Sequence, residues 1–153
     1  VSEANEKAGR QIFNGSGGTA RASSFARVPI ERMTNINIDP GNDGKLEDII
    51  SKTENGVVLS GTKSWSIGSN REQFHFACDM GWRVKDGQKL YPVKNCAYSG
   101  KTLPFYNSLD MVGDESTWEV QYVDNCGKGA PNQIMCLGHG IPVCRFHDVK
   151  VGS

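Results

Sequence analysis

The sequence predicts a mostly β fold of the α+β class, built from antiparallel sheets and hairpins in a barrel- or sandwich-like arrangement with two short helices. Glycine accounts for 18 of the 153 residues, an excess over the usual share of about 7% that favours tight turns. Apolar residues alternate strictly with other residues over 72–84. The dipeptide Asp86-Gly87 that follows is a strong hairpin signal.

Residues 1–24 are expected to form a flexible lead-in to a single domain over 25–153. The run Asn14-Gly15-Ser16-Gly17-Gly18-Thr19 contains only small and polar residues, as linkers do. From 25 to 38, apolar residues are interleaved with arginine and asparagine. Ile36-Asn37-Ile38 alternates as a half-buried strand does, so this stretch is predicted to be extended.

Two short helices are predicted. The first is expected over 45–54, where apolar residues recur at helical spacing, with Asp43 capping its start and Asn55-Gly56 ending it. The second is expected over 103–112, with Gly113 as its stop.

The clearest pattern is one long strand over 72–84. Its core face is predicted to be Phe74, Phe76, Cys78, Met80, Trp82 and Val84. A return strand over 89–93 follows the Asp86-Gly87 turn, and Pro92 places part of it at an edge or a bulge. Further strands are expected over 118–122, 133–137 and 141–151.

Composition excludes several classes of protein. The 17 basic residues balance the 17 acidic ones, which argues against binding to nucleic acid or to an anionic membrane. No apolar run approaches the ~20 residues of a membrane span. Five cysteines, an odd number, favour reduced thiols and a cytoplasmic location. No nucleophile elbow, phosphate loop or dinucleotide fingerprint occurs.

The segment Asn125-Cys126-Gly127-Lys128-Gly129 is the first place that could carry chemistry. A cysteine between a strand and a Gly-rich turn is expected to be exposed, and Lys128 beside it favours the thiolate, the form that binds metals and electrophiles. We therefore expect Cys126 to be an accessible thiol, more reactive than Cys78. The alternative is a tight turn with an incidental cysteine.

Two other places remain open. The pattern C-x2-H-x4-C-x2-H, formed by Cys136, His139, Cys144 and His147, has zinc-capable ligands but spans two apparent strands. It describes either a structural zinc site or separate packing and surface residues. The segment from Glu31 to Asn35 places a cation and an amide on extended backbone, which suits a peptide or a carboxylate. The alternative is a solvated strand face.

Taken in order, several segments resemble the C-terminal part of the TldD/PmbA family, also called the modulator of DNA gyrase family. The matching segments span about 19–152: Ala20-Arg21-Ala22-Ser23-Ser24-Phe25, Arg32-Met33-Thr34-Asn35, Tyr91-Pro92-Val93-Lys94, Asn125-Cys126-Gly127-Lys128-Gly129 and His147-Asp148-Val149-Lys150-Val151-Gly152. No single motif is specific, but the ordered set is.

The resemblance implies a zinc metallopeptidase of the TldD-like branch. In that branch two histidines of a His-Glu-x-x-x-His helix and one distant cysteine hold the metal, and the cysteine maps onto Cys126. This chain lacks that helix, and His75, His139 and His147 do not belong to it. The chain is therefore expected to be the C-terminal part of a larger protein or a naturally truncated relative. Alone it should be inactive and bind no zinc tightly.

The resemblance also implies substrates and partners. The expected role is degradation or maturation of peptides or unfolded proteins by a cytoplasmic homo- or heterodimer, with zinc in the full-length protein. Arg32, Asn35, Lys128 and His139 are the candidate substrate-binding residues. The alternative is a non-catalytic peptide-binding or subunit-assembly domain. A His-Glu-x-x-x-His helix encoded upstream of Val1 would favour the enzyme.

Overall fold

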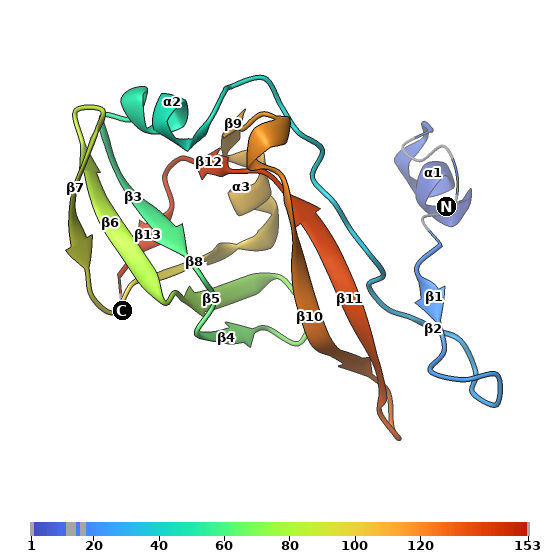
Figure 1. Ribbon diagram of the computed structural model, residues 1–153. Coiled ribbons are helices and arrows are strands. Elements are labelled where there is room, and N and C mark those ends of the chain that lie inside the picture. The colour runs from blue at the N-terminus through green and yellow to red at the C-terminus, as the bar shows by residue number, and fades with distance from the viewer. Residues whose placement is uncertain (1, 12–14, 16–17, 153) are drawn as a thin grey trace. The chain divides into compact units, whose positions relative to one another are not determined.

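A computed structural model describes residues 2–11, 15 and 18–152 of the chain (Figure 1). Strands predominate, in several antiparallel sheets, and no sheet closes into a barrel within the described part of the chain. The elements in chain order are α1 (Ser2–Ala8), β1 (Ala20–Arg21), β2 (Ile30–Glu31), α2 (Leu46–Ser51), β3 (Asn55–Ser60), β4 (Ser64–Ile67), β5 (Gln73–Ala77), β6 (Met80–Lys85), β7 (Gln88–Val93), β8 (Ala97–Lys101), α3 (Thr102–Asn107), β9 (Leu109–Val112), η1 (Glu115–Thr117), β10 (Glu119–Lys128), β11 (Gln133–Ile141), β12 (Cys144–Phe146) and β13 (Lys150–Val151).

The chain divides into two compact units, each built from two separate stretches. The first unit comprises Val1–Asn37 and Val120–Gly140, and the second comprises Ile38–Glu119 and Ile141–Ser153. The single domain over 25–153 stays a prediction. Within the described ranges, no helix has the length and apolar character needed to cross a membrane.

The second unit contains most of the strands. One sheet has the order β13-β8-β5-β4, another has the order β3-β6-β7, and β9 pairs with β12. Helix α2 lies at the end of the three-stranded sheet beside the β6–β7 turn (Figure 1). Arg145 on β12 donates hydrogen bonds to both carboxylate oxygens of Asp110 on β9, at 3.0 and 2.7 Å. These bonds lower the pKa of Asp110, and the ion pair fastens the short β9–β12 ribbon.

Aromatic rings from four elements form a half-buried cluster beside the four-stranded sheet. Phe105 of α3 stacks on Phe146 of β12 with ring centroids 4.1 Å apart, and it meets Phe74 of β5 edge-on at 5.0 Å. Phe76 of β5 stacks on Tyr98 of β8 at 5.6 Å. Offset and edge-on aromatic pairs add to the stabilisation that burial itself provides.

The predicted strand over 72–84 is two strands in two sheets. Strand β5 ends at Ala77, and β6 begins at Met80 and pairs with β3 instead of β8. The alternation of side chains fails in β6 because a bulge lies between Trp82 and Val84. Val84 is therefore buried, whereas Met80 is 52% exposed and the prediction that it faces the core is wrong.

The hairpin prediction is confirmed. Strands β6 and β7 pair across a two-residue turn in which Asp86 and Gly87 both have positive φ, at 50° and 75°. Positive φ at both central residues is what a type I′ turn requires. Pro92 lies on β7, which is the edge strand of its sheet, as expected.

Both predicted helices are shorter than expected. Helix α2 ends at Ser51, and Asn55-Gly56 opens β3 instead of ending the helix. Asp43 does not cap α2, because its Oδ2 accepts a hydrogen bond from Val112 N at 2.8 Å. Helix α3 ends at Asn107. The apolar residues of 109–112 belong to β9, whose backbone pairs with β12 instead of continuing the hydrogen bonds of the helix.

The first unit contains α1, the β1–β2 pair and the β10–β11 pair. Helix α1 and strand β1 fall in the predicted lead-in 1–24, where no regular element was expected. Asn14, Ser16 and Gly17 of the small-residue run lie outside the described residues. The predicted strand at Ile36-Asn37-Ile38 is absent from the described structure, because side chains rather than backbone ladders connect this stretch to β11.

Replacing Val84 with alanine should destabilise the second unit by about 2–3 kcal/mol, because Val84 is 1% exposed and its loss leaves a cavity. Met80→Ala on the same strand should cost less, because about half of Met80 is exposed to solvent. Urea denaturation followed by tryptophan fluorescence measures both free energies of unfolding. Equal losses would contradict the β6 register.

Candidate functional site

Cys126 lies inside strand β10, which pairs with β11. Its side chain is 4% exposed, so the expectation of an exposed thiol is wrong. The strand continues past Cys126 to Lys128, and the turn therefore begins later than the glycines indicated. The Lys128 ammonium donates a hydrogen bond to Glu31 O at 2.9 Å. The order of reactivity of Cys126 and Cys78 stays a prediction.

A buried arginine fixes the backbone around Cys126. Arg21 of β1 donates from Nη2 to Cys126 O at 2.7 Å and from Nε to Met33 O at 2.9 Å. One guanidinium thus joins the Cys126 segment to the segment Arg32-Met33-Thr34-Asn35, which lies far away in the sequence. Hydrogen bonds from a charged donor are among the stronger ones, and their geometry is fixed by the planar group.

The buried side chain of Gln133 also joins two distant stretches of the first unit, next to the turn between β10 and β11. Gln133, the first residue of β11, accepts a hydrogen bond from Ser23 N at 2.9 Å and donates one to Val28 O at 3.0 Å. Both ends of its amide are therefore engaged with the stretch after β1. Together with Arg21, Gln133 connects the stretch after β1 to the strand pair β10–β11.

Two asparagine side chains connect the stretch after β2 to β11. Asn35 Oδ1 accepts a hydrogen bond from Gly138 N at 3.0 Å, and Asn37 Oδ1 accepts one from Gly140 N at 2.7 Å. The two amides lie two residues apart, so they reach alternate residues of the strand. They satisfy backbone N–H groups of β11 as a neighbouring strand would.

His139 stands between these two glycines on β11. Its Nδ1 lies 3.1 Å from both Ile36 N and Ile36 O. If Nδ1 accepts from Ile36 N, the other ring nitrogen carries the proton and can donate; in the opposite tautomer it can accept. That other nitrogen, Nε2, is buried and has no hydrogen-bond partner among the described residues, and the same holds for Arg32 Nε.

The four candidate substrate-binding residues therefore differ. Asn35 and Lys128 bond to backbone groups and hold the unit together, whereas Arg32 and His139 each have a buried polar atom that finds no hydrogen-bond partner among the residues the structure describes. Buried polar groups are nearly always hydrogen-bonded in proteins, so the exceptions need an explanation. Substrate binding by any of the four stays a prediction.

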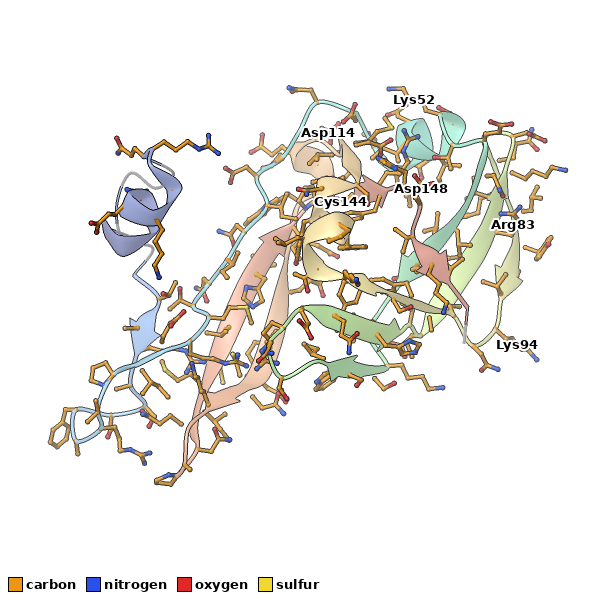
Figure 2. The ribbon with its side chains drawn as sticks, turned by 180° about the vertical axis from the view of Figure 1, so that it is seen from behind. Lys52, Arg83, Lys94, Asp114, Cys144 and Asp148 are labelled. Carbon is orange, nitrogen blue, oxygen red and sulfur yellow. The ribbon has the colours of Figure 1, made fainter. Side chains whose placement is uncertain are left out.

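The four residues of the alternative zinc pattern are divided between the two units. Cys136 and His139 belong to the first unit, whereas Cys144 (Figure 2) and His147 belong to the second. No group of three or more histidine, cysteine, aspartate or glutamate residues placed to hold a metal occurs in the part of the chain that the structure describes. Cys136 instead accepts a hydrogen bond from the Tyr122 hydroxyl at 3.2 Å, and burial raises the pKa of the Cys144 thiol.

Sequence reasoning missed Arg21, Asn37 and Gln133. Arginine and glutamine are usually solvent-exposed, so composition gave no reason to place them inside. The only available signal was the position of Arg21 in the segment that resembles the family. The long-range partners of these side chains lie about a hundred residues away and leave no local pattern.

Replacing Arg21 with methionine should destabilise the first unit by about 2–4 kcal/mol, because two carbonyl groups lose a charged donor. Native-state alkylation of Cys126 should then become about tenfold faster or more, since its protection depends on this contact. The matched control is Arg27→Met, which removes an exposed bond to Pro131 O. Unchanged Cys126 labelling in Arg21→Met, measured by peptide mapping, would contradict the role of Arg21.

Comparison with known proteins gives consistent matches. Residues 4–153 match the family described as "PmbA/TldA metallopeptidase C-terminal domain". A metalloprotease of Synechocystis sp. is 31% identical over 137 residues, covering 89% of this chain and 28% of the relative. A zinc metalloprotease TldD homolog of Saccharolobus solfataricus is 27% identical over 136 residues, covering 89% of this chain and 29% of the relative. The crystal structure of TldE from Thermococcus kodakarensis matches with a TM-score of 0.64 and 16% identity, covering 97% of this chain and 29% of that one.

Proposed function

The chain belongs to the PmbA/TldA metallopeptidase family as a C-terminal domain, and we propose that it completes the metal site of a TldD-like zinc metallopeptidase. In this proposal Cys126 supplies one ligand, and a His-Glu-x-x-x-His helix outside these 153 residues supplies two more. The chain spans less than a third of the length of the curated relatives it matches. Activity, substrates and partners of the whole protein are therefore part of the proposal.

The observation that carries the proposal is the fixed position of Cys126 inside a chain that matches the family along nearly its whole length. A cysteine thiolate is a strong zinc ligand. The described residues offer no cluster of three metal-binding side chains, so Cys126 fits the part of a single ligand in a shared site. Because Arg21 holds the Cys126 carbonyl, the sulfur would be presented with little loss of conformational freedom.

When bound by three protein ligands, zinc keeps a fourth position for a water molecule that it makes more acidic. The residues of this chain would position the sulfur ligand and the substrate. We assign substrate contact to Arg32 and His139, each of which has a buried nitrogen with no hydrogen-bond partner in the described part of the chain. Asn35 and Lys128 would act indirectly, by holding the strands that carry Cys126 and His139.

We propose peptides or unfolded proteins as substrates, a homo- or heterodimer with a family member as the assembly, and the cytoplasm as the location. The balanced charge of the chain supports a peptide rather than a polyanion as the ligand. The relative from Saccharolobus solfataricus is named a zinc metalloprotease, which supports zinc over other divalent metals.

One observation favours the second candidate function, a non-catalytic binding or assembly domain. Val120 and Tyr122 on β10 and Ile134 on β11 are more than half exposed in this chain. Exposed apolar residues gathered on one hairpin are typical of contact surfaces. A metal-ligand helix encoded upstream of Val1 would favour the enzyme, and its absence would favour the assembly domain.

The test of the proposal is the zinc content of the complete protein. Cys126→Ser should lower zinc affinity by about 100-fold or more, since even outer-shell changes cost 10–100-fold, and should abolish chelator-sensitive peptide hydrolysis. Cys136→Ser is the matched control, because Cys136 is an exposed thiol of the same unit. The 153 residues alone should hydrolyse no peptide. Full zinc content in Cys126→Ser, or chelator-sensitive hydrolysis by the chain alone, would refute the proposal.

A further inference from the structure

Two cysteines of the second unit lie where the chain passes between its two larger sheets. Cys78 belongs to the short connection from β5 to β6, and Cys96 belongs to the connection from β7 to β8. In both connections the chain moves between the four-stranded and the three-stranded sheet. Both side chains are buried, and both thiols are free.

The two connections lie side by side in register. Strands β5 and β8 pair Phe76 with Tyr98 and Ala77 with Ala97, so the next opposed pair is Cys78 and Cys96. Cys78 N donates a hydrogen bond to Cys96 O at 2.8 Å. Directly opposed residues at a hydrogen-bonded position have Cα atoms about 5.5 Å apart, which falls inside the range that a disulfide spans.

Both sulfur atoms occupy the same face of the sheet. Side chains of directly opposed residues point the same way, so Cys78 and Cys96 extend the face that carries Phe76 and Tyr98. Burial raises the pKa of Cys78, and the nearby charge of Cys96 raises it further.

Cys96 Sγ packs closely against Gly81 on one side, whereas a pocket adjoins both cysteines on another. A Cβ placed on Gly81 would lie 2.6 Å from Cys96 Sγ, so only glycine permits the present position of this thiol. An open pocket of about 480 Å³ is lined by both cysteines together with Lys63, His75 and Lys94. The Lys94 side chain projects outward at the end of β7 (Figure 2). A small polar oxidant can therefore approach the pair from solvent.

We propose that Cys78 and Cys96 are an oxidation site that closes into a reversible disulfide under peroxide. One thiol loses its proton, and the resulting thiolate attacks one oxygen of hydrogen peroxide and breaks the O–O bond. The sulfur becomes a sulfenic acid, and the departing hydroxide takes up the proton that the thiol lost and leaves as water. The second thiol attacks that sulfenic sulfur, forming the S–S bond and releasing a second water. Each cysteine loses one electron and one proton overall, and the peroxide takes up both electrons. A dithiol reductant reverses the bond by exchange.

The disulfide would link the β5–β6 connection covalently to the β7–β8 connection. The chain from Cys78 to Cys96 contains β6, the hairpin turn and β7, so a disulfide would close this whole hairpin into a loop. Cross-linking restricts the unfolded chain and raises stability when native geometry is kept. The oxidised protein should therefore melt at a higher temperature than the reduced one.

The experiment treats the reduced chain with hydrogen peroxide, blocks remaining thiols with iodoacetamide and maps peptides by mass spectrometry without reduction. We expect a Cys78–Cys96 linked peptide pair, a rise in melting temperature, and loss of both on adding dithiothreitol. Wild-type mapping needs no mutant that might fail to fold. In Cys96→Ser, Cys78 should instead be trapped as sulfenic acid by dimedone, whereas Cys144→Ser should form the disulfide normally.

Three results would overturn the inference. Both cysteines could remain fully alkylated after peroxide, each could be found overoxidised without a linked pair, or either could link to Cys136 instead. A linked pair with no rise in melting temperature would contradict the expected stabilisation of the protein by the disulfide. None of these results depends on zinc or on peptidase activity, so they leave the proposed function untouched.

Discussion

The first unit depends on the buried guanidinium of Arg21. It bonds to the carbonyl oxygens of Met33 and Cys126, and these two residues belong to stretches that no strand ladder joins in the described structure. A buried charge is tolerated only when its donors are satisfied, so both carbonyls must stay in place for Arg21 to stay inside. The position of Cys126, the candidate metal ligand, thus depends on Arg21, whose buried charge needs the Cys126 carbonyl oxygen as a hydrogen-bond acceptor.

The second unit is organised differently, by apolar packing and by two chain crossings. Phe74, Phe105 and Phe146 belong to a half-buried aromatic cluster beside the four-stranded sheet. The connections at Cys78 and Cys96 lead the chain into the neighbouring sheet, and a hydrogen bond from Cys78 N to Cys96 O joins them. A disulfide between these two thiols would join the connections through which the chain passes from one sheet to the other.

The sequence predicted the features that local chemistry determines. Asp86-Gly87 formed the expected turn because its two residues tolerate positive φ. The alternation over 72–84 was visible, but it could not reveal that the chain changes sheets after Ala77, since Cys78-Asp79 contains neither glycine nor proline. The resemblance singled out Cys126, yet its burial could not be foreseen, because it results from contacts with residues such as Arg21 about a hundred positions away.

X-ray absorption at the zinc edge of the complete, zinc-loaded protein would examine the role of Cys126 most directly. A sulfur ligand lies about 2.3 Å from zinc, whereas nitrogen and oxygen ligands lie at about 2.0–2.2 Å. We expect one sulfur scatterer in the native protein and none in Cys126→Ser, with Cys136→Ser unchanged. A native spectrum without sulfur, or a sulfur signal that survives Cys126→Ser, would contradict this account.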